Sequence, residues 1–386
     1  MIRPLTICAV SGGRADYGLL VPVLRMLCDD PRFDLQLVLT GQHLSGVAGG
    51  TAARVRADGF KVSAEIDMGL GSDDAVAITK SAARGMDGMA DVLARLKPDL
   101  VLVLGDRYEI AVTAIAATIA RLPIAHIAGG DVTLGAFDDA FRHSISKMSH
   151  LHFVTNEESA RRLRQLGEQP ERIHVTGSPG LDLVRSTPVP SREDFFASVG
   201  LAPKSINLVV TFHPETLADD TVRDLDELLS ALDQLGSDVA ILLTGSNADP
   251  LSRQIDARIE TFVAGNPSRR LVGSLGAERY FAALTYMDAV VGNSSSGLYE
   301  APSFGIPTVN IGERQSGRLK ASSVIDCVPA RSAILAAIKS AWARGKKPAT
   351  NPYGDGHAAP RIVAALAAIS DPRELLDKRF VDLKAA

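Results

Sequence analysis

The sequence has few of the features that mark secreted, membrane or nucleic-acid-binding proteins. Only three of its 386 residues are cysteines, and Cys8, Cys28 and Cys327 lie too far apart to form a CxxC or Cys/His motif. This spacing argues against disulfides and structural zinc and favours a reducing compartment. Basic side chains number 41 against 45 acidic ones, and the formal net charge of −4 provides no basic field to attract nucleic acid or an anionic membrane.

Long apolar runs are also absent. No segment reaches the roughly 18 uninterrupted apolar residues that a membrane-spanning helix needs. The first apolar run, Leu5 to Val10, is too short for a signal peptide. We therefore expect a cytoplasmic protein with no membrane partner. With 46% hydrophobic and 22% charged residues, the composition is typical of a compact α/β enzyme.

Short apolar runs alternate with turns and helical patterns, which predicts parallel sheets covered by helices. The expected strands are 5–10, 35–39, 100–104, 124–127 and 151–154 in the first half, and 206–211, 239–243, 288–292 and 308–311 in the second. A helix is expected over 72–96, ending before Pro98. The prolines at 188 and 190 interrupt the alternation, so the interdomain linker is expected there.

The length and this alternation predict two domains. We expect an α/β fold of two Rossmann-like, doubly wound domains, residues 1–186 and 187–357, that face each other across a cleft. The segment 358–386, helical by pattern from Ala358 to Leu375, is expected to cross back onto the first domain.

The loops that follow the strands hold most candidate residues, because ligands bind beyond the carboxyl ends of open parallel sheets. After the first strand, a glycine turn opens a helix whose free N–H groups, together with Arg14, are suited to holding an anion. The GxGxxG dinucleotide fingerprint is absent. An equally good interpretation is that Gly12 and Gly13 only make a tight turn.

Acidic residues converge from three successive loops of the first half. Asp106 and Arg107 follow the strand 100–104, where a carboxylate can move protons and a guanidinium can neutralise phosphate. Asp106 is equally suited to capping the next helix. Asp131 follows the next strand, and Asp138-Asp139 come soon after, although such a pair is also typical of the first turn of a helix.

The second half offers a histidine and a serine-rich loop. His213 ends the strand 206–211, where its near-neutral pKa suits proton transfer or contact with a diphosphate, although a buried core histidine is also possible. The stretch Asn293 to Glu300 is suited to holding phosphate through N–H and hydroxyl groups, with Glu300 placed to accept hydrogen bonds from two ribose hydroxyls. His150 and His152 are interpreted as structural, because an HxH pair alone is poor evidence for a metal.

Taken together and in this order, the motifs resemble the hydrolysing UDP-N-acetylglucosamine 2-epimerases that supply precursors of sialic and legionaminic acids. The segments that carry the resemblance are Arg14-Ala15-Asp16-Tyr17, Thr40-Gly41-Gln42-His43, Gly105-Asp106-Arg107, Gly129-Gly130-Asp131, Asp138-Asp139, Arg142-His143-Ser144-Ile145-Ser146-Lys147, Phe212-His213-Pro214, Asn293-Ser294-Ser295 and Gly312-Glu313-Arg314-Gln315-Ser316-Gly317-Arg318.

The resemblance implies a GT-B-like fold with UDP held mainly by the C-terminal domain, a homodimer or homotetramer, and no metal or redox cofactor. It implies elimination of UDP to a 2-acetamidoglucal, followed by addition of water at C1 and reprotonation of C2. The acid/base and leaving-group residues implied by position are Asp106, Asp131, Asp139 and His213. The implied nucleotide contacts are Arg14, Arg107, Arg142, Asn247, Ser294, Ser295, Gly297, Glu300 and Arg314.

One departure and several alternatives stand beside this interpretation. Many relatives carry Glu or His where this chain has Ala128, so any role of that side chain is absent or shifted to Asp131. The segments 58–99 and 317–325 resemble the branch that acts on UDP-2,4-diacetamido-2,4,6-trideoxyglucose, and UDP-N-acetylglucosamine is nearly as good a candidate. A retaining glycosyltransferase and a non-catalytic nucleotide-sugar sensor are the alternative functions.

Overall fold

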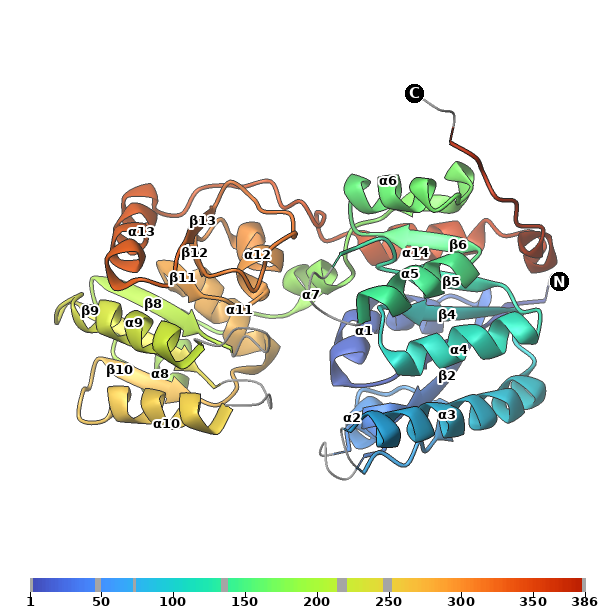
Figure 1. Cartoon of the computed structure of the whole chain (residues 1–386), viewed down its shortest axis with the longest axis horizontal. Helices are drawn as coiled ribbons and strands as arrows, with labels where there is room; N and C mark the ends of the chain where they lie inside the picture. Colours follow the sequence, from blue (N-terminus) through green and yellow to red (C-terminus); the bar gives the residue numbers. More distant parts are fainter. Residues whose placement is uncertain are drawn as a thin grey trace. The chain divides into compact units, whose positions relative to one another are not determined.

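The computed structural model describes residues 3–45, 50–71, 74–132, 138–213, 221–245 and 252–383. The chain divides into two compact units: unit 1 comprises Met1–Leu183 and Tyr353–Ala386, and unit 2 comprises Val184–Pro352. Each unit is built on one parallel sheet with helices on both faces (Figure 1). The predicted α/β class with two doubly wound sheets is therefore confirmed.

The sheet of unit 1 has seven strands in the order β3-β2-β1-β4-β5-β6-β7. All of the pairings are parallel. The strand order reverses between β1 and β4, and such a switch point is where doubly wound sheets bind ligands. The strands are β1 (Leu5–Ser11), β2 (Phe33–Thr40), β3 (Val62–Ile66), β4 (Leu100–Leu104), β5 (Ile124–Ile127), β6 (Leu151–Val154) and β7 (Ile173–Val175).

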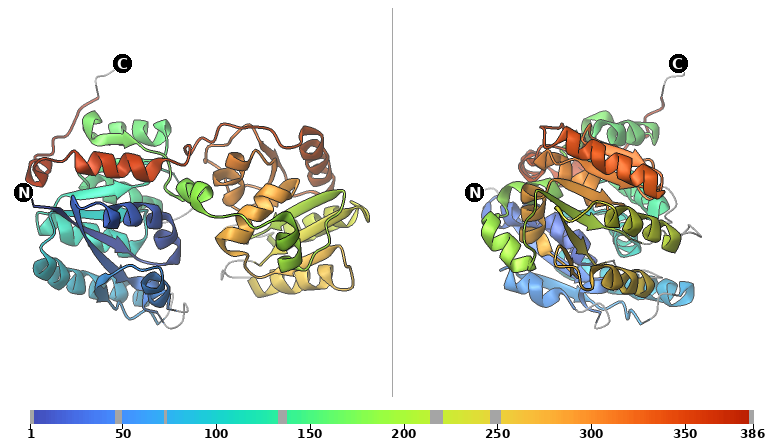
Figure 2. Two further views of the ribbon diagram at one scale, coloured as in Figure 1. Left: turned by 180° about the vertical axis from the view of Figure 1, so that it is seen from behind. Right: turned by 90° about the vertical axis from the view of Figure 1, so that its left-hand side faces the viewer.

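Helices cover both faces of this sheet. One face packs on α1, α2 and α14, and the other on α3, α4 and α5. The C-terminal α14 lies against α1 in unit 1, as Figure 2 shows. The helices are α1 (Arg14–Asp29), α2 (Ala52–Ala57), α3 (Ala75–Leu96), α4 (Tyr108–Ile119), α5 (Asp138–Met148), α6 (Glu157–Gln165), α7 (Gly180–Ser186) and α14 (Ala358–Ala367).

Unit 2 repeats this arrangement with six parallel strands in the order β10-β9-β8-β11-β12-β13, so its switch point lies between β8 and β11. The strands are β8 (Ile206–Thr211), β9 (Val239–Thr244), β10 (Arg269–Val272), β11 (Ala289–Gly292), β12 (Thr308–Ile311) and β13 (Val324–Cys327). The helices are α8 (Arg192–Val199), α9 (Thr221–Asp233), α10 (Ser252–Val263), α11 (Gly276–Tyr286), α12 (Ser296–Tyr299) and α13 (Arg331–Arg344).

All nine predicted strands are present, five of them with the predicted bounds. The helix predicted over 72–96 begins at Ala75, where the Asp74 carboxylate accepts a hydrogen bond from Ala77 N at 2.9 Å, and it ends before Pro98 as predicted. The helix predicted to continue to Leu375 was wrong in its length. It stops at Ala367, and the 3-10 helix η4 (Pro372–Leu376) follows.

The three cysteines are free, and they lie in different parts of the fold. Within the parts of the chain that the structure describes, none of the helices combines the length and apolar character that crossing a bilayer requires. The described residues also contain no group of three or more His, Cys, Asp or Glu side chains arranged to hold a metal ion.

Candidate active site

The turn after β1 places a buried carboxyl group at the switch point of unit 1. Asp16 lies in the first turn of α1 and is 7% exposed, and its Oδ2 has no hydrogen-bond partner among the described residues. Burial raises the pKa of Asp16 to about 7; the Arg107 charge opposes the shift and Glu109 reinforces it. Arg14, the first residue of α1, is exposed.

The 3-10 turn after β2 packs directly on this site. Gly41 has a φ of 57°, and a Cβ there would lie 2.7 Å from Gly12 O and 2.9 Å from Glu109 Cγ. Only glycine permits both the left-handed backbone and the close approach. His43 follows, with Nε2 2.9 Å from Ser11 Oγ; burial lowers the pKa of His43 to about 4. His43 therefore holds the turn against β1 as a neutral ring.

Arg107 and Glu109 form an ion pair at the start of α4. The Arg107 guanidinium donates to both Glu109 carboxylate oxygens, at 3.2 and 3.3 Å, and Glu109 is fully buried. Burial by itself would lower the pKa of Arg107, but attraction by Glu109, Asp16 and Asp138 raises it. Arg107 therefore stays charged among several carboxylates, which suits contact with a phosphate.

Arg142 on α5 joins two of the predicted catalytic carboxylates. Its guanidinium forms an ion pair with Asp106 and lies 3.5 Å from Asp139 Oδ1, and the residue is buried. Asp106 is not a helix cap, because Arg107 occupies the N-cap position of α4. Asp139 stands in the first turn of α5 beside Asp138, so both interpretations of the acidic pair hold: they begin a helix and they belong to the cluster.

Asp131 lies one strand further along, after β5. Its Oδ1 accepts hydrogen bonds from Thr155 Oγ1 at 2.7 Å and Ser159 Oγ at 2.5 Å. Burial raises the pKa of Asp131, and these two hydroxyls and the Arg142 charge oppose the shift. The positive charge of Arg142 therefore acts on Asp131 as well as on Asp106 and Asp139. Ala128, just after the same strand, has a φ of 64°.

His126, His150 and His152 of unit 1 serve the fold. His126 places Nε2 2.7 Å from Gly105 O and Nδ1 3.2 Å from Ser146 Oγ, and burial lowers the pKa of His126 to about 3. His150 Nδ1 accepts a hydrogen bond from the backbone of β5 at 3.1 Å. His152 Nε2 lies 2.9 Å from the buried Glu168 carboxylate. These contacts agree with the structural interpretation of His150 and His152.

In unit 2, Asn293 fastens the two loops of the switch point together. Its Oδ1 accepts a hydrogen bond from His213 N, and its Nδ2 donates to His213 O, both at 2.8 Å. Its own carbonyl accepts from Gln315 Nε2 at 2.8 Å and Arg314 Nη1 at 3.3 Å. The structure thus brings the predicted residues His213 and Arg314 to one place. Sequence reasoning gave no role to Asn293, although it belongs to a quoted motif.

The serine loop that follows is held by its own hydroxyls. Ser294 Oγ lies 3.1 Å from Ser296 Oγ, which also contacts the Tyr280 hydroxyl. Ser295 is the N-cap residue of the short α12. Glu300 follows α12, and its buried Oε2 has no hydrogen-bond partner within the described ranges. Burial raises the pKa of Glu300 to about 7.

Gly297 has a packing role in this loop. A Cβ at Gly297 would lie 2.6 Å from Thr308 Cγ2, and the Gly297 carbonyl accepts from Thr308 Oγ1 at 2.9 Å. Glycine is therefore required for the close approach of α12 to β12. Asn247, predicted to contact the nucleotide, lies outside the described residues.

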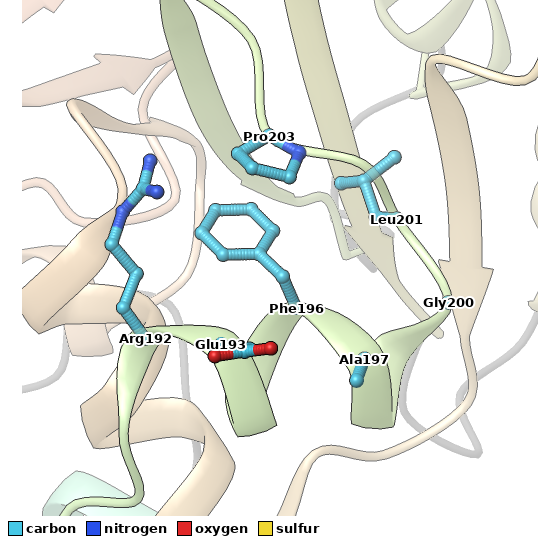
Figure 3. Close-up of a pocket in the computed structure, with 7 residues that line it drawn as sticks. All are labelled: Arg192, Glu193, Phe196, Ala197, Gly200, Leu201 and Pro203. Carbon is cyan, nitrogen blue, oxygen red and sulfur yellow. The ribbon is translucent and has the colours of Figure 1, made fainter.

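A separate pocket of unit 2 takes no part in this arrangement. It has a volume of about 560 Å³ and lies between α8 and the turn that follows it, lined by Phe196, Leu201 and Pro203 among others (Figure 3). The Arg192 guanidinium lies 4.9 Å from the centre of the Phe196 ring. None of the predicted site residues lines this pocket.

Comparisons with known proteins identify relatives along nearly the whole chain. Residues 25–367 match the family model described as UDP-N-acetylglucosamine 2-epimerase. The chain is 38% identical to the polysialic acid biosynthesis protein P7 of Escherichia coli, over 85% of this chain and 84% of that protein. It is 36% identical to the GDP/UDP-N,N'-diacetylbacillosamine 2-epimerase (hydrolyzing) of Campylobacter jejuni, over 83% of each.

The fold is also found in solved structures. The UDP-GlcNAc 2-epimerase from Neisseria meningitidis, bound to UDP-GlcNAc, superposes with a TM-score of 0.76 at 17% identity. The match covers 94% of this chain and 99% of that one. The two-sheet architecture described above is therefore shared along almost the full length of both proteins.

Proposed function

The chain belongs to the UDP-N-acetylglucosamine 2-epimerase family, and on this premise we propose that it is a hydrolysing 2-epimerase. It would convert a UDP-linked 2-acetamido sugar and water to the free 2-epimeric sugar and UDP. The observation that carries the proposal is that the Arg142 guanidinium forms an ion pair with Asp106 and lies 3.5 Å from Asp139 Oδ1, while its charge also opposes the rise in the pKa of Asp131.

The proposed reaction needs groups that hold and release protons near neutral pH. The proton on C2 is poorly acidic because no carbonyl is adjacent, so its removal requires a positioned base and help for the departing diphosphate. The C2–H electrons form the C1=C2 bond as the bond from C1 to the UDP oxygen breaks. Water then adds its oxygen to C1, and C2 takes a proton on the other face.

The carboxylates of unit 1 suit these proton transfers. Burial raises the pKa of Asp131 and Asp138, and neighbouring carboxylates raise one another's proton affinity, so that one can donate while another accepts. We assign the acid/base and leaving-group roles to Asp106, Asp131, Asp139 and His213.

We assign the nucleotide to the serine loop of unit 2 and the arginines. The buried, unpartnered Oε2 of Glu300 suits an acceptor for the ribose hydroxyls. The N–H and hydroxyl groups of Ser294 and Ser295, with Arg314 beside them, suit the diphosphate. Of the remaining nucleotide contacts proposed, Asn247 lies outside the described residues, Gly297 acts through packing, and the others are Arg14, Arg107 and Arg142.

We propose two candidate sugars, UDP-2,4-diacetamido-2,4,6-trideoxyglucose and UDP-N-acetylglucosamine. The name of the Campylobacter relative favours the first, and that of the Escherichia relative fits a product used for sialic acids. Either product would be a precursor of a nonulosonic acid. We further propose a cytoplasmic homodimer or homotetramer without a metal, so light scattering should show more than one chain and EDTA should leave turnover unchanged.

The deciding experiment is incubation of the pure protein with each UDP sugar in deuterated water. We expect release of UDP and a free manno sugar with deuterium at C2, identified by NMR and mass spectrometry. A retaining glycosyltransferase would need an acceptor and leave C2 unexchanged, a non-hydrolysing epimerase would return a UDP-linked product, and a sensor would bind without turnover. Absence of UDP release from both sugars would contradict the proposal.

A further inference from the structure

A large hollow lies in unit 1 at the amino ends of its strands, at the opposite edge of the sheet from the candidate active site. It has a volume of about 1140 Å³, and its walls are the C-terminal halves of α3 and α4 and the 3-10 helix η4. We call it the α3–α4 hollow. Arg3, Pro98 and Pro123, which precede β1, β4 and β5, also line it.

The walls of the α3–α4 hollow combine apolar and polar surface in nearly equal parts. Met86 and Leu93 line it from α3, Ile119 from α4, and Leu376 from η4. Ile119 is 75% exposed and Leu376 is 37% exposed, so two large aliphatic side chains here are left without full cover. A concavity that combines apolar surface with charged groups suits a ligand that has both an apolar and a charged part.

The rim of the hollow carries an excess of positive charge. Its two carboxylates are already engaged: Asp99 forms an ion pair with Arg3 at 2.5 Å, and Asp371 accepts a hydrogen bond from Arg373 N at 2.9 Å. The side chains of Lys97 and Arg121 form no hydrogen bond or ion pair with any residue in the described parts of the chain. The hollow therefore offers uncompensated cations beside an apolar surface.

Two of these cations stand on backbone that favours glycine. Lys97 ends α3 with a φ of 48°, and Arg121 follows α4 with a φ of 55°. Glycine is the usual residue at such left-handed helix ends because any Cβ adds strain. A cation near a helix C-terminus also gains from the helix dipole. The side chains of Lys97 and Arg121 therefore suit two roles, stabilisation of the helix C-termini and contact with an anionic ligand.

We propose that the α3–α4 hollow binds a small amphipathic anion. Its aliphatic or aromatic body would lie on Met86, Ile119 and Leu376, and its carboxylate, sulfonate or phosphate group would lie between Lys97 and Arg121. Part of the wall, Arg3 and η4, lies outside the residues that match the family model. None of the residues that line the hollow belongs to the candidate active site, so the proposal is independent of the function proposed for that site.

The test uses 8-anilinonaphthalene-1-sulfonate, an amphipathic anion, as the probe in a fluorescence titration of the full chain. We expect saturable binding of about one probe per chain. Decanoate should displace the probe, whereas the same concentration of inorganic phosphate should not, because phosphate lacks the apolar body. The control variant Arg95→Ala removes a charge on α3 outside the hollow and should leave the affinity unchanged.

Two double variants separate a ligand role from a capping role. Replacing Lys97 and Arg121 by glycine removes both cations and relieves the backbone strain at both left-handed positions. We therefore expect at least tenfold weaker probe binding and an equal or higher Tm. The pair Lys97→Asn and Arg121→Asn, which also tolerates this backbone, should give the same loss of binding.

Three results would overturn the proposal. The first is the absence of saturable probe binding, and the second is an affinity that neither double variant changes. The third is a hollow covered by a second copy of the chain: light scattering would show a dimer that Ile119→Asp dissociates, and the probe would bind only to the dissociated form.

Discussion

Arg142 on α5 forms an ion pair with Asp106, two residues after the end of β4, and so joins two segments that lie 36 residues apart in the sequence. The same guanidinium lies 3.5 Å from Asp139. One cation thus contacts a carboxylate of its own helix and a carboxylate from the turn after β4.

The first prediction concerns this grouping. Asp106→Asn keeps the size of the side chain and removes its charge and its proton-transfer capacity. We expect kcat for UDP release to fall by about 100-fold or more, in the range typical of a lost general acid or base. Asp87→Asn, an exposed change on α3, is the matched control and should keep full activity. Unchanged turnover in Asp106→Asn would remove Asp106 from the catalytic residues.

The second prediction concerns the buried carboxyl group of Asp16. Its pKa in the fold is about 7, above the ordinary value of 3.8, so the fold favours the neutral form. The resulting loss of stability is absent below pH 4, grows as pH rises towards 7 and is complete above it. Asp16→Asn removes this loss, so its Tm gain over the wild type should be larger at pH 8 than at pH 4.5.

Differential scanning calorimetry of both proteins at the two pH values measures this difference. At about 1.4 kcal/mol per pKa unit the effect amounts to a few kcal/mol. Equal Tm differences at pH 4.5 and pH 8 would mean that Asp16 is ionised in the fold. Asp87→Asn again serves as the control, because its exposed carboxylate should shift Tm little at either pH.

The third prediction concerns Glu300 and UDP. Ribose hydroxyls donate to the ionised carboxylate, whereas the pKa of about 7 leaves part of the unliganded protein protonated at neutral pH. Affinity for UDP should therefore increase between pH 6 and pH 8 more in the wild type than in Glu300→Gln. At pH 8 the variant should bind about tenfold more weakly, since a hydrogen bond to a charged group contributes about 1.5–3 kcal/mol.

Isothermal titration calorimetry at both pH values provides the comparison. The ionisation of UDP itself affects binding to both proteins equally. The difference between their pH dependences therefore reports on Glu300 alone. Parallel pH dependence in the two proteins would show that Glu300 does not contact the nucleotide.

The fourth prediction concerns the buried Glu168, which accepts hydrogen bonds from His152 Nε2, Lys147 Nζ and Lys378 Nζ at 2.9, 2.8 and 2.7 Å. Burial by itself would raise the pKa of Glu168, but these three donors lower it to about 2. The stabilisation is therefore present above the ordinary value of 4.5 and is lost as pH falls towards 2.

Glu168→Gln should lower the free energy of unfolding at pH 7 by about 3 kcal/mol, because it leaves the largely buried Lys378 and the buried His152 without their anionic partner. Urea unfolding at pH 7 and pH 3 measures the effect, which should shrink at the lower pH. Glu171→Gln, an exposed change nearby, should be neutral. A loss of equal size at both pH values would show that packing, and not charge, holds this cluster.

The central strands could be predicted from the sequence and the edge strands could not. All four strands that were not predicted, β3, β7, β10 and β13, lie at the edges of the two sheets. A central parallel strand is buried on both faces and forms a continuous apolar run. The edge strand β10, Arg269–Val272, is only partly buried and carries two arginines, so its pattern does not differ from that of a loop.

In the candidate site, too, some residues could be predicted from the sequence and others could not. The residues that follow strands β4, β5, β8 and β11 could be found because topology alone brings strand ends together. The partners Thr155 and Ser159 of Asp131 come from beyond β6, and only the packed structure shows that they reach it. The helix predicted to reach Leu375 would pass through Pro372, which disfavours helical backbone at Asp371, and α14 ends before it, at Ala367.

The packing of α14 on α1 has a consequence for synthesis on the ribosome. The apolar faces of α1 and α14 belong to one core, yet all of unit 2 is translated between them. The surface of α1 that α14 covers therefore stays exposed on the nascent chain until α14 emerges. A chain that stalls before residue 358 would expose that surface to chaperones and proteases.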